Sequence, residues 1–176
     1  KRGFDILVSL VMLILLSWLF LILAVAIKLD SRGPVFYRQV RVTTGNRDFR
    51  IFKFRTMVNN ADKIGSLVTT GNDARITRVG ARIRKCRLDE IPQLLNILKG
   101  EMSFVGTRPE VRKYVDRYSD EMMATLLMPA GVTSLASISF KDEDELIDEY
   151  TMKGMSVDDA YMEKVLPEKM KFNLEY

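Results

Sequence analysis

The sequence predicts a mixed α/β fold that is mainly helical, in which a membrane-embedded helix precedes a small cytosolic domain with a short hairpin and amphipathic interfacial helices. An uncharged apolar run near the N-terminus predicts the first helix. Alternating apolar and basic residues after it predict the hairpin, and apolar residues at helical spacing fill most of the remainder. We expect a membrane-embedded helix over residues 1–29, a core over residues 30–140 and an acidic helical segment over residues 141–176.

The apolar run covers residues 6–27 and contains no charged residue, Pro or Gly. At 1.5 Å per residue, a helix of this length reaches roughly 33 Å, which matches a hydrocarbon core of about 30 Å. It is apolar on all sides, unlike an amphipathic surface helix. The alternative is a helix buried inside a soluble protein, but a domain of this size could hardly surround it.

Basic residues flank both ends of the run, with Lys1 and Arg2 before it and Lys28 and Arg32 after it. Because positive flanks stay in the cytoplasm, a helix that enters and leaves through the same leaflet satisfies both ends. Such a re-entrant helix needs a break whose freed backbone groups find partners. We expect that break at Ser17-Trp18, near the middle of the run.

A hairpin is predicted next. After a turn at Ser31-Arg32-Gly33-Pro34, Val35-Phe36-Tyr37 suggests one strand and residues 49–54 a second. Thr43-Thr44-Gly45-Asn46 has the composition of the turn between them. Residues 59–75 are rich in Asn and Gly and form a polar connector.

The best-defined helix of the domain follows a basic segment in which Ile76, Val79 and Ile83 fall at helical spacing. One face of the helix is apolar, Asp89 suits its N-cap, and Gly100 suits the position after its end. The residues of the apolar face are Ile91, Leu94, Leu95 and Leu98.

The rest of the chain is predicted to be mostly helical. We expect a helix over residues 112–127, a strand or loop over 132–140, and acidic helices near 142–150 and 156–166. Ser156 and Asp159 have the spacing of a capping box for the last of these helices.

Composition excludes several classes of chemistry. The 176 residues include no His and one Cys. Ser–His and Cys–His nucleophile pairs, His-ligated metals and disulfides within the chain are therefore excluded. Proton or phosphoryl transfer must instead use carboxylates, Lys, Arg, Tyr or a metal held by oxygen.

The charge is unevenly distributed along the chain. Residues 1–140 carry 22 Lys and Arg against 12 Asp and Glu, whereas residues 141–176 carry 5 against 11. Excess positive charge indicates an anionic partner, such as a phosphorylated substrate, an anionic lipid or a nucleic acid. We expect the acidic segment to be a solvated face.

The stretch from Arg82 to Glu90 is the most informative for chemistry, because four basic side chains lead directly into Asp89 and Glu90. A helix N-terminus lowers the energy of a carboxylate and of a phosphate beside it. Asp can attack phosphorus to give an acyl phosphate, with Arg and Mg²⁺ offsetting the repulsion. Asp-Glu at a helix start is common, so the spacing alone favours a structural role in which Asp89 caps the helix and Glu90 is a first-turn acid.

Two further basic sites are candidates for anion binding. Lys53 and Arg55 belong to one of them, and the alternative is a solvated strand face. Arg108 lies in a loop shaped by Gly106 and Pro109 and could bind an oxyanion through two N–H groups, or cap a nearby helix. The single Cys86 is expected to be a small packing residue.

Taken together, these motifs and their order resemble the bacterial sugar transferase family, the monotopic phosphoglycosyl transferases. The resemblance extends from Lys1 to about Gly131. The segments that carry it are Lys1-Arg2-Gly3-Phe4-Asp5, Gly33-Pro34-Val35-Phe36-Tyr37-Arg38-Gln39, Phe49-Arg50-Ile51-Phe52-Lys53-Phe54-Arg55-Thr56-Met57, Leu88-Asp89-Glu90-Ile91-Pro92-Gln93-Leu94-Leu95-Asn96, Ile97-Leu98-Lys99-Gly100-Glu101-Met102-Ser103 and Phe104-Val105-Gly106-Thr107-Arg108-Pro109.

The resemblance implies transfer of a sugar 1-phosphate from a UDP-sugar to undecaprenyl phosphate, giving undecaprenyl diphosphate-sugar and UMP. This reaction primes the synthesis of exopolysaccharide, O-antigen and other surface glycans. It implies a location at the bacterial inner membrane, embedded in membrane lipid, with the catalytic domain on the cytoplasmic face. Nucleic acid is not among the implied partners, and the oligomeric state stays open.

The resemblance also implies roles for single residues. Asp89 matches the family's nucleophile and Glu90 its partner, and both are implied ligands of the family's cofactor, Mg²⁺. By position, Arg84 and Arg108 would bind phosphate. Lys53 and Arg55 would line the same basic site, which is a weaker assignment.

Three departures from the family pattern stand out. Related enzymes usually have Ser-Pro where this chain has Ser17-Trp18, and many have Pro at Thr107. After Gly131 the usual continuation changes and an acidic segment follows, so the donor sugar stays open.

The competing hypothesis is a non-enzymatic, membrane-anchored module whose basic face binds anionic lipid or nucleic acid. The chain has no aromatic-interleaved platform for single strands and no DNA-reading motif.

Overall fold

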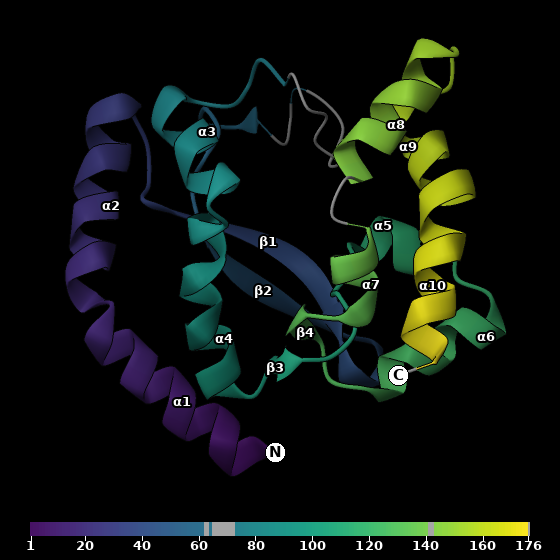
Figure 1. Ribbon diagram of the computed structural model, residues 1–176, viewed down its shortest axis with the longest axis horizontal. Coiled ribbons are helices and arrows are strands. Elements are labelled where there is room, and N and C mark those ends of the chain that lie inside the picture. Colours follow the sequence, from purple (N-terminus) through teal and green to yellow (C-terminus); the bar gives the residue numbers. More distant parts are fainter. Residues whose placement is uncertain (62–63, 65–72, 141–142, 176) are drawn as a thin grey trace.

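The computed structural model describes residues 1–61, 64, 73–140 and 143–175 (Figure 1). It confirms the mixed, mainly helical α/β fold. The helices are α1 (Arg2–Leu15), α2 (Ser17–Asp30), α3 (Arg78–Lys85), α4 (Leu94–Lys99), α5 (Arg112–Val115), α6 (Asp120–Met123), α7 (Leu135–Ser139), α8 (Glu143–Met152), α9 (Val157–Ala160) and α10 (Leu166–Leu174). The strands are β1 (Phe36–Thr43), β2 (Arg47–Phe54), β3 (Ser103–Val105) and β4 (Gly131–Thr133). Short 3₁₀ helices are η1 (Thr44–Asn46), η3 (Leu88–Gln93) and η4 (Ala124–Leu127), and a π-helical turn, Tyr161–Val165, joins α9 to α10.

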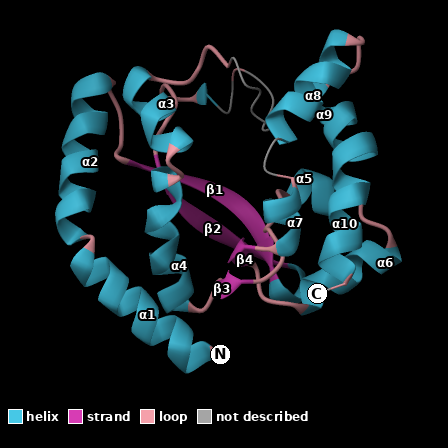
Figure 2. Ribbon diagram, viewed as in Figure 1, coloured by secondary structure: helices cyan, strands magenta, loops and turns pink. Residues whose placement is uncertain are grey.

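The hairpin runs between two groups of helices. Figure 2 shows α1 to α4 near one end of β1 and β2 and α5 to α10 near the other. The helices of the first group pack on two apolar clusters shared with the hairpin, whereas the second group surrounds a cluster of its own. This arrangement leaves the space between the two groups for a pocket.

The apolar run forms two helices rather than one. No single helix among the described residues is long and apolar enough to cross a membrane, whereas α1 and α2 together pass that test and are bent by 62°. The break falls at Leu16, next to the predicted Ser17-Trp18 site. Ser17 Oγ donates a hydrogen bond to the Ile14 carbonyl at 2.8 Å, so a backbone acceptor next to the bend keeps a partner.

Large apolar side chains cover the outside of this helix pair, so the buried-helix alternative is wrong for this chain. The opposite side of the pair packs on the domain through Leu23 and Ile27, and polar contacts add to this packing. Ser103 Oγ donates to the buried Asp5 carboxylate at 2.9 Å, and the Arg2 guanidinium binds the carbonyls of Ile97 and Leu98 at the end of α4. The exposed apolar residues of the pair include Phe4, Leu7, Leu10, Ile14, Leu15, Trp18, Leu21, Ile22, Val25 and Leu29.

The predicted hairpin is confirmed and is longer than the apolar pattern indicated. β1 and β2 are antiparallel over their full length, and η1 forms the turn. Gly45 and Asn46 adopt positive φ there, at 69° and 58°, which Gly and Asn tolerate best. In this register Tyr37 pairs with Lys53 and Arg41 with Phe49, so these residues share one face of the hairpin.

The helix before the pocket is anchored to the hairpin by a buried amide. The Phe52 N–H donates to Asn96 Oδ1 at 2.8 Å, and Asn96 Nδ2 donates to the Arg50 carbonyl at 2.9 Å. Gly100 follows α4 with φ of 84°, as predicted for a residue that ends a helix. The predicted helix through residues 76–86 is confirmed as α3.

The predicted single helix over residues 112–127 is wrong. The chain forms α5, then α6, then η4, because Ser119 starts a new helix by accepting a hydrogen bond from the Met122 N–H. Residues 132–140 are neither purely strand nor loop. They begin in β4, which pairs in parallel with β3, and continue as α7.

The C-terminal segment packs closely against the domain, so the expectation of a purely solvated face is also wrong. Its helices surround a buried cluster that includes Val111 and Tyr114 from α5 and its N-cap. The predicted N-cap at Ser156 is confirmed, since Ser156 Oγ accepts a hydrogen bond from the Asp159 N–H at 3.1 Å, and the Asp159 carboxylate accepts from the Ser156 hydroxyl at 2.6 Å. Cys86 is exposed rather than packed, because it ends α3 on the solvent side.

Candidate active site

A pocket of about 930 Å³ lies between the two groups of helices. Its wall comes from the inner face of the hairpin, the segment after β2, α3, η3, the loop after β3, and the α7–α8 region. All six candidate residues from the sequence lie on this wall, namely Lys53, Arg55, Arg84, Asp89, Glu90 and Arg108. The structure therefore joins residues that are 55 positions apart in the chain.

Asp89 does not cap a helix, contrary to the prediction. Arg87 adopts a left-handed conformation, with φ of 55°, and is itself the N-cap of η3. Asp89 therefore lies inside the first turn, and no side-chain capping hydrogen bond forms there. Among the described residues, none forms an ion pair within 4 Å of its carboxylate, which leaves Asp89 available for chemistry.

Glu90, the neighbour of Asp89, is held by two cations. Lys53 Nζ lies 2.8 Å from its Oε1, and Arg108 Nη2 lies 3.9 Å from the same atom. Burial would raise the pKa of Glu90, but Lys53 and Arg108 outweigh it and lower the pKa to about 2. Glu90 is thus a fixed carboxylate that organises the positive side chains of the pocket.

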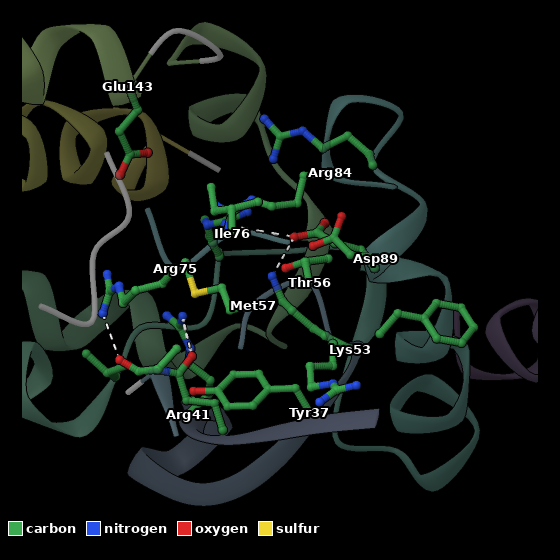
Figure 3. A pocket seen from close by; sticks show the side chains of 18 of the residues that line it. Tyr37, Arg41, Lys53, Thr56, Met57, Arg75, Ile76, Arg84, Asp89 and Glu143 are labelled. Carbon is green, nitrogen blue, oxygen red and sulfur yellow. Dashed lines mark hydrogen bonds and ion pairs between the residues drawn. The ribbon is translucent and has the colours of Figure 1, made fainter. Parts of the chain in front are cut away.

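The pKa of Asp89 is shifted upward, in the opposite direction to that of Glu90. Burial raises the pKa of Asp89, and the negative charge of Glu90 adds to that effect. Lys53 and Arg84 oppose it without reversing it. Figure 3 draws Asp89 between Arg84 and Lys53. Two adjacent carboxylates whose pKa values move in opposite directions are typical of a catalytic pair.

Burial lowers the pKa of Lys53, and the negative charge of Glu90 opposes that effect. Arg108 remains charged, because three carboxylates including Glu90 outweigh its desolvation and raise its pKa. Its loop is fixed by close backbone contact, since a Cβ on Gly106 would lie 2.0 Å from the Pro129 carbonyl oxygen. The pocket therefore presents an array of cations with set positions.

Arg55 has a different role from the one the sequence suggested. Its side chain lines the pocket wall, but its guanidinium donates to the backbone carbonyls of Arg32, Ser31 and Ile27, with 2.7 Å to Ser31 and 3.5 Å to Ile27. These carbonyls lie at the C-terminal end of α2, where a cation is favoured. Arg55 thus connects the helix pair to the pocket wall. Both of its terminal guanidinium nitrogens already donate to carbonyls, so they are poorly placed to bind a phosphate as well.

Sequence reasoning missed several residues of the wall. Tyr37, Gln39 and Arg41 lie on the pocket side of β1, and their alternation along the strand could have indicated it. Arg75 and Glu143 reach the pocket from distant segments and carry no comparable signal. Figure 3 shows Glu143 on the wall away from Asp89.

Asp89 and Glu90 fit the kind of Mg²⁺ site in which substrate phosphates provide some of the ligands. Among the described residues, no group of three or more His, Cys, Asp or Glu side chains converges on one point. Mg²⁺ at phosphate-transfer sites is usually bound by one or two carboxylates, with substrate phosphates and water completing its shell. Asp89 and Glu90 are two such carboxylates.

Comparison with known proteins places this pocket in context. The sequence profile described as bacterial sugar transferase matches residues 1–170. The chain is 52% identical over 141 residues to UDP-N-acetylgalactosamine-undecaprenyl-phosphate N-acetylgalactosaminephosphotransferase of Aeromonas hydrophila, covering 78% of this chain and 33% of that protein. It is 40% identical over 144 residues to UDP-glucose:undecaprenyl-phosphate glucose-1-phosphate transferase of Klebsiella pneumoniae, covering 79% and 30%.

A shorter relative is matched over more of its length. The exopolysaccharide production protein ExoY of Rhizobium meliloti is 37% identical over 158 residues, which cover 81% of this chain and 70% of that protein. The chain spans about a third of the length of the two longer relatives. The matches to the family profile and to ExoY each extend over most of the chain, and the chain belongs to the bacterial sugar transferase family.

Proposed function

We propose that this chain transfers a sugar 1-phosphate from a UDP-sugar to undecaprenyl phosphate, producing undecaprenyl diphosphate-sugar and UMP. The observation that carries the proposal is the Asp89 carboxylate, which opens on the pocket without an ion pair among the described residues while cations surround it. The names of two matched relatives include undecaprenyl phosphate and a UDP-sugar, which supports the same substrates for this chain.

In the first step an oxygen of Asp89 attacks the β-phosphorus of the donor. A bond forms between that oxygen and phosphorus, and the bond from phosphorus to the oxygen bridging the two phosphates breaks. UMP leaves with the bridging oxygen, and the sugar phosphate stays on Asp89 as an acyl phosphate. Covalent catalysis of this kind divides one difficult transfer into two easier ones.

Cations of the pocket wall make this attack possible. Arg108 and Arg84 bind the diphosphate and offset the repulsion between its charge and the carboxylate. Lys53, held by Glu90 at 2.8 Å, adds a third positive charge. Asp89 and Glu90 would hold Mg²⁺, which would supply further charge stabilisation for the leaving phosphate.

In the second step an oxygen of the lipid phosphate attacks the same phosphorus. The bond between phosphorus and Asp89 breaks, the product carries the new diphosphate, and the Asp89 carboxylate is restored. Both nucleophiles react as anionic oxygens, so neither step needs a general base. The absence of His from the sequence is consistent with this chemistry.

The bent helix pair is proposed to be a re-entrant anchor in the bacterial inner membrane, with the pocket on the cytoplasmic side. Its apolar outer surface suits a hydrocarbon environment, and basic residues flank both of its ends. A helix pair that returns to the same face would hold the pocket at the level of lipid phosphates. Soluble UDP-sugar and membrane-bound acceptor could then meet in one site.

The test is UMP release by the purified protein in detergent with Mg²⁺, undecaprenyl phosphate and a panel of UDP-sugars. Wild-type protein should release UMP with at least one donor, which also identifies the sugar. Asp89→Asn should lower kcat by at least about 10³-fold, since it removes the nucleophile. It should keep or exceed the wild-type melting temperature, because a neutral side chain costs less to bury.

Asp116→Asn is the matched control, because Asp116 is an exposed carboxylate at the C-cap of α5 and does not line the pocket. It should retain wild-type activity. Full activity of Asp89→Asn would exclude Asp89 as the nucleophile, and wild-type protein that releases no UMP with any donor would contradict the proposed reaction.

A further inference from the structure

A buried lysine in the C-terminal segment stands out from its surroundings. Lys169 lies on α10 with 1% of its surface exposed, within a cluster of apolar side chains. A buried ammonium is costly unless it is paired and hydrogen-bonded. Its Nζ lies 3.0 Å from Glu143 Oε2, 3.2 Å from the Tyr161 hydroxyl and 3.8 Å from Glu110 Oε1.

Glu110, Tyr161 and Lys169 form a directed chain, which we call the buried triad. The Tyr161 hydroxyl donates to Glu110 Oε1 at 2.6 Å, so its oxygen is left to accept from Lys169. Burial raises the pKa of the Tyr161 hydroxyl well above its usual value, with Glu110 adding to the effect, so the proton stays on Tyr161. Burial would raise the pKa of Glu110, but Lys169 and Arg41 lower it.

The triad ends on the loop that carries Arg108. Glu110 is two residues from Arg108, with Pro109 between them to restrict the backbone. The same loop is held from the hairpin, since Arg41 Nη1 donates to the Pro109 carbonyl at 3.1 Å and the Val42 N–H to the Glu110 carbonyl at 2.9 Å. The hairpin thus holds the backbone of the loop. The Glu110 carboxylate is held by the triad through Oε1 and by Arg41, whose Nη1 lies 3.8 Å from Oε2.

We infer that Tyr161 and Lys169 are positioning residues that hold Arg108 in the orientation in which it binds the diphosphate. The inference rests on the proposed function, which gives Arg108 its phosphate. Glu110 is the last member of a stiff loop, so a change in its partners is transmitted to Arg108 across one proline. Tyr161 also reaches the pocket wall, but in this inference it and Lys169 act on the chemistry through the loop of Arg108.

A double-mutant cycle with Arg108 tests this inference. Tyr161→Phe keeps the ring and removes only the hydroxyl, and Lys169→Met keeps an unbranched side chain of similar length. Each should lower kcat/KM for UMP release by about tenfold, the value of a hydrogen bond to a charged group. In an Arg108→Gln background each should change kcat/KM by less than about twofold, because the positioned group is gone.

Tyr114→Phe is the matched control. Its hydroxyl also donates to a carboxylate at 2.6 Å in the same cluster, but the partner is Asp158 on α9. Its effect on kcat/KM should be the same with Arg108 as with Gln at that position. Thermal unfolding of all variants in the same detergent should give similar losses for Tyr114→Phe and Tyr161→Phe.

A second readout separates this inference from the proposed reaction. The affinity of the full chain for inorganic pyrophosphate, measured by calorimetry, should show the same coupling between Tyr161 and Arg108. Coupled pyrophosphate binding without UMP release would sink the proposed reaction and support the positioning role. UMP release with equal effects of Tyr161→Phe in both backgrounds would overturn the positioning role alone. Loss of both UMP release and pyrophosphate binding in wild-type protein would overturn both.

Discussion

Asp89 and Glu90 are neighbours in the chain, yet their environments shift their pKa values in opposite directions and suit them to different roles. Lys53 and Arg108 both lie within 4 Å of Oε1 of Glu90, so its negative charge is balanced by two cations. Asp89 forms no ion pair within 4 Å in the part of the chain that the structure describes, and burial together with the charge of Glu90 raises its pKa. A carboxylate that is poorly stabilised by its surroundings is the better nucleophile of the two.

The pH dependence of kcat should report Asp89. Asp89 attacks only as the carboxylate, so activity is lost as pH falls through its raised pKa, at a higher pH than for an ordinary Asp. Arg84→Met removes a positive charge that lowers this pKa, so the acidic limb should move to higher pH. Glu90→Gln removes a negative charge that raises it, so residual activity should show the limb at lower pH.

The measurement is a pH profile of UMP release at constant ionic strength. Arg82→Met is the control, because Arg82 is exposed on the same helix and does not line the pocket. It should leave the limb in place. Shifts of the same sign for Arg84→Met and Glu90→Gln would show that the limb belongs to another group.

At the scale of elements, the bend between α1 and α2 shows how a helix can be broken without proline. Leu16 adopts φ of −95° and ψ of 4°, and backbone hydrogen bonds to Met12 and from Phe20 continue on either side of it. The Ser17 hydroxyl binds the Ile14 carbonyl. The bend therefore leaves few backbone groups without partners, which is the condition for placing it in lipid.

Cysteine labelling in membrane vesicles tests the topology of this pair. The exposed native Cys86 marks the face of the catalytic domain. In a Cys86→Ser background, Gly3→Cys and Arg32→Cys should both react with an impermeant maleimide from the face on which Cys86 reacts. Gly3 is suitable because a Cβ added there meets no other atom within 4 Å. Labelling of the two positions from opposite faces would contradict a re-entrant pair.

At the scale of the whole molecule, the acidic segment is part of the domain rather than an appendage. Its cluster joins Val111 and Tyr114 to Ile147, Val165 and other fully buried side chains. It also contributes Glu143 to the pocket wall and the buried triad to the Arg108 loop. The family profile, which extends to residue 170, covers this segment as well.

Substitutions of buried residues in this segment should therefore lower the free energy of unfolding as much as substitutions in any other hydrophobic core. Ile147→Ala should lower the free energy of unfolding by about 2–5 kcal/mol, because Ile147 is fully buried. Met152→Ala in the same helix should change it by less than about 0.5 kcal/mol, since 87% of Met152 is exposed. A separate transition for the segment in Ile147→Ala, with the rest of the chain unchanged, would show that it folds on its own.

How much could be predicted from the sequence depended on the range of the interactions. The hairpin, the break near Ser17 and the N-cap at Ser156 follow from local patterns, and all three are confirmed. Asp89 was predicted to cap a helix because the spacing allowed it, whereas the left-handed turn at Arg87 depends on how α3 meets η3. The partners of Arg55 and Lys169 lie 22 or more residues away in most cases, and no local pattern encodes them.

The contact between Asp5 and Ser103 has a consequence for biosynthesis. The two residues are 98 positions apart, so at ribosomal speed Ser103 is made about 5–20 s after Asp5. Throughout that interval the apolar pair has left the ribosome, or is leaving it, without the partners that later hold it. On the proposed membrane placement, insertion thus precedes docking, and the folding domain is recruited to an anchor that already sits in the bilayer.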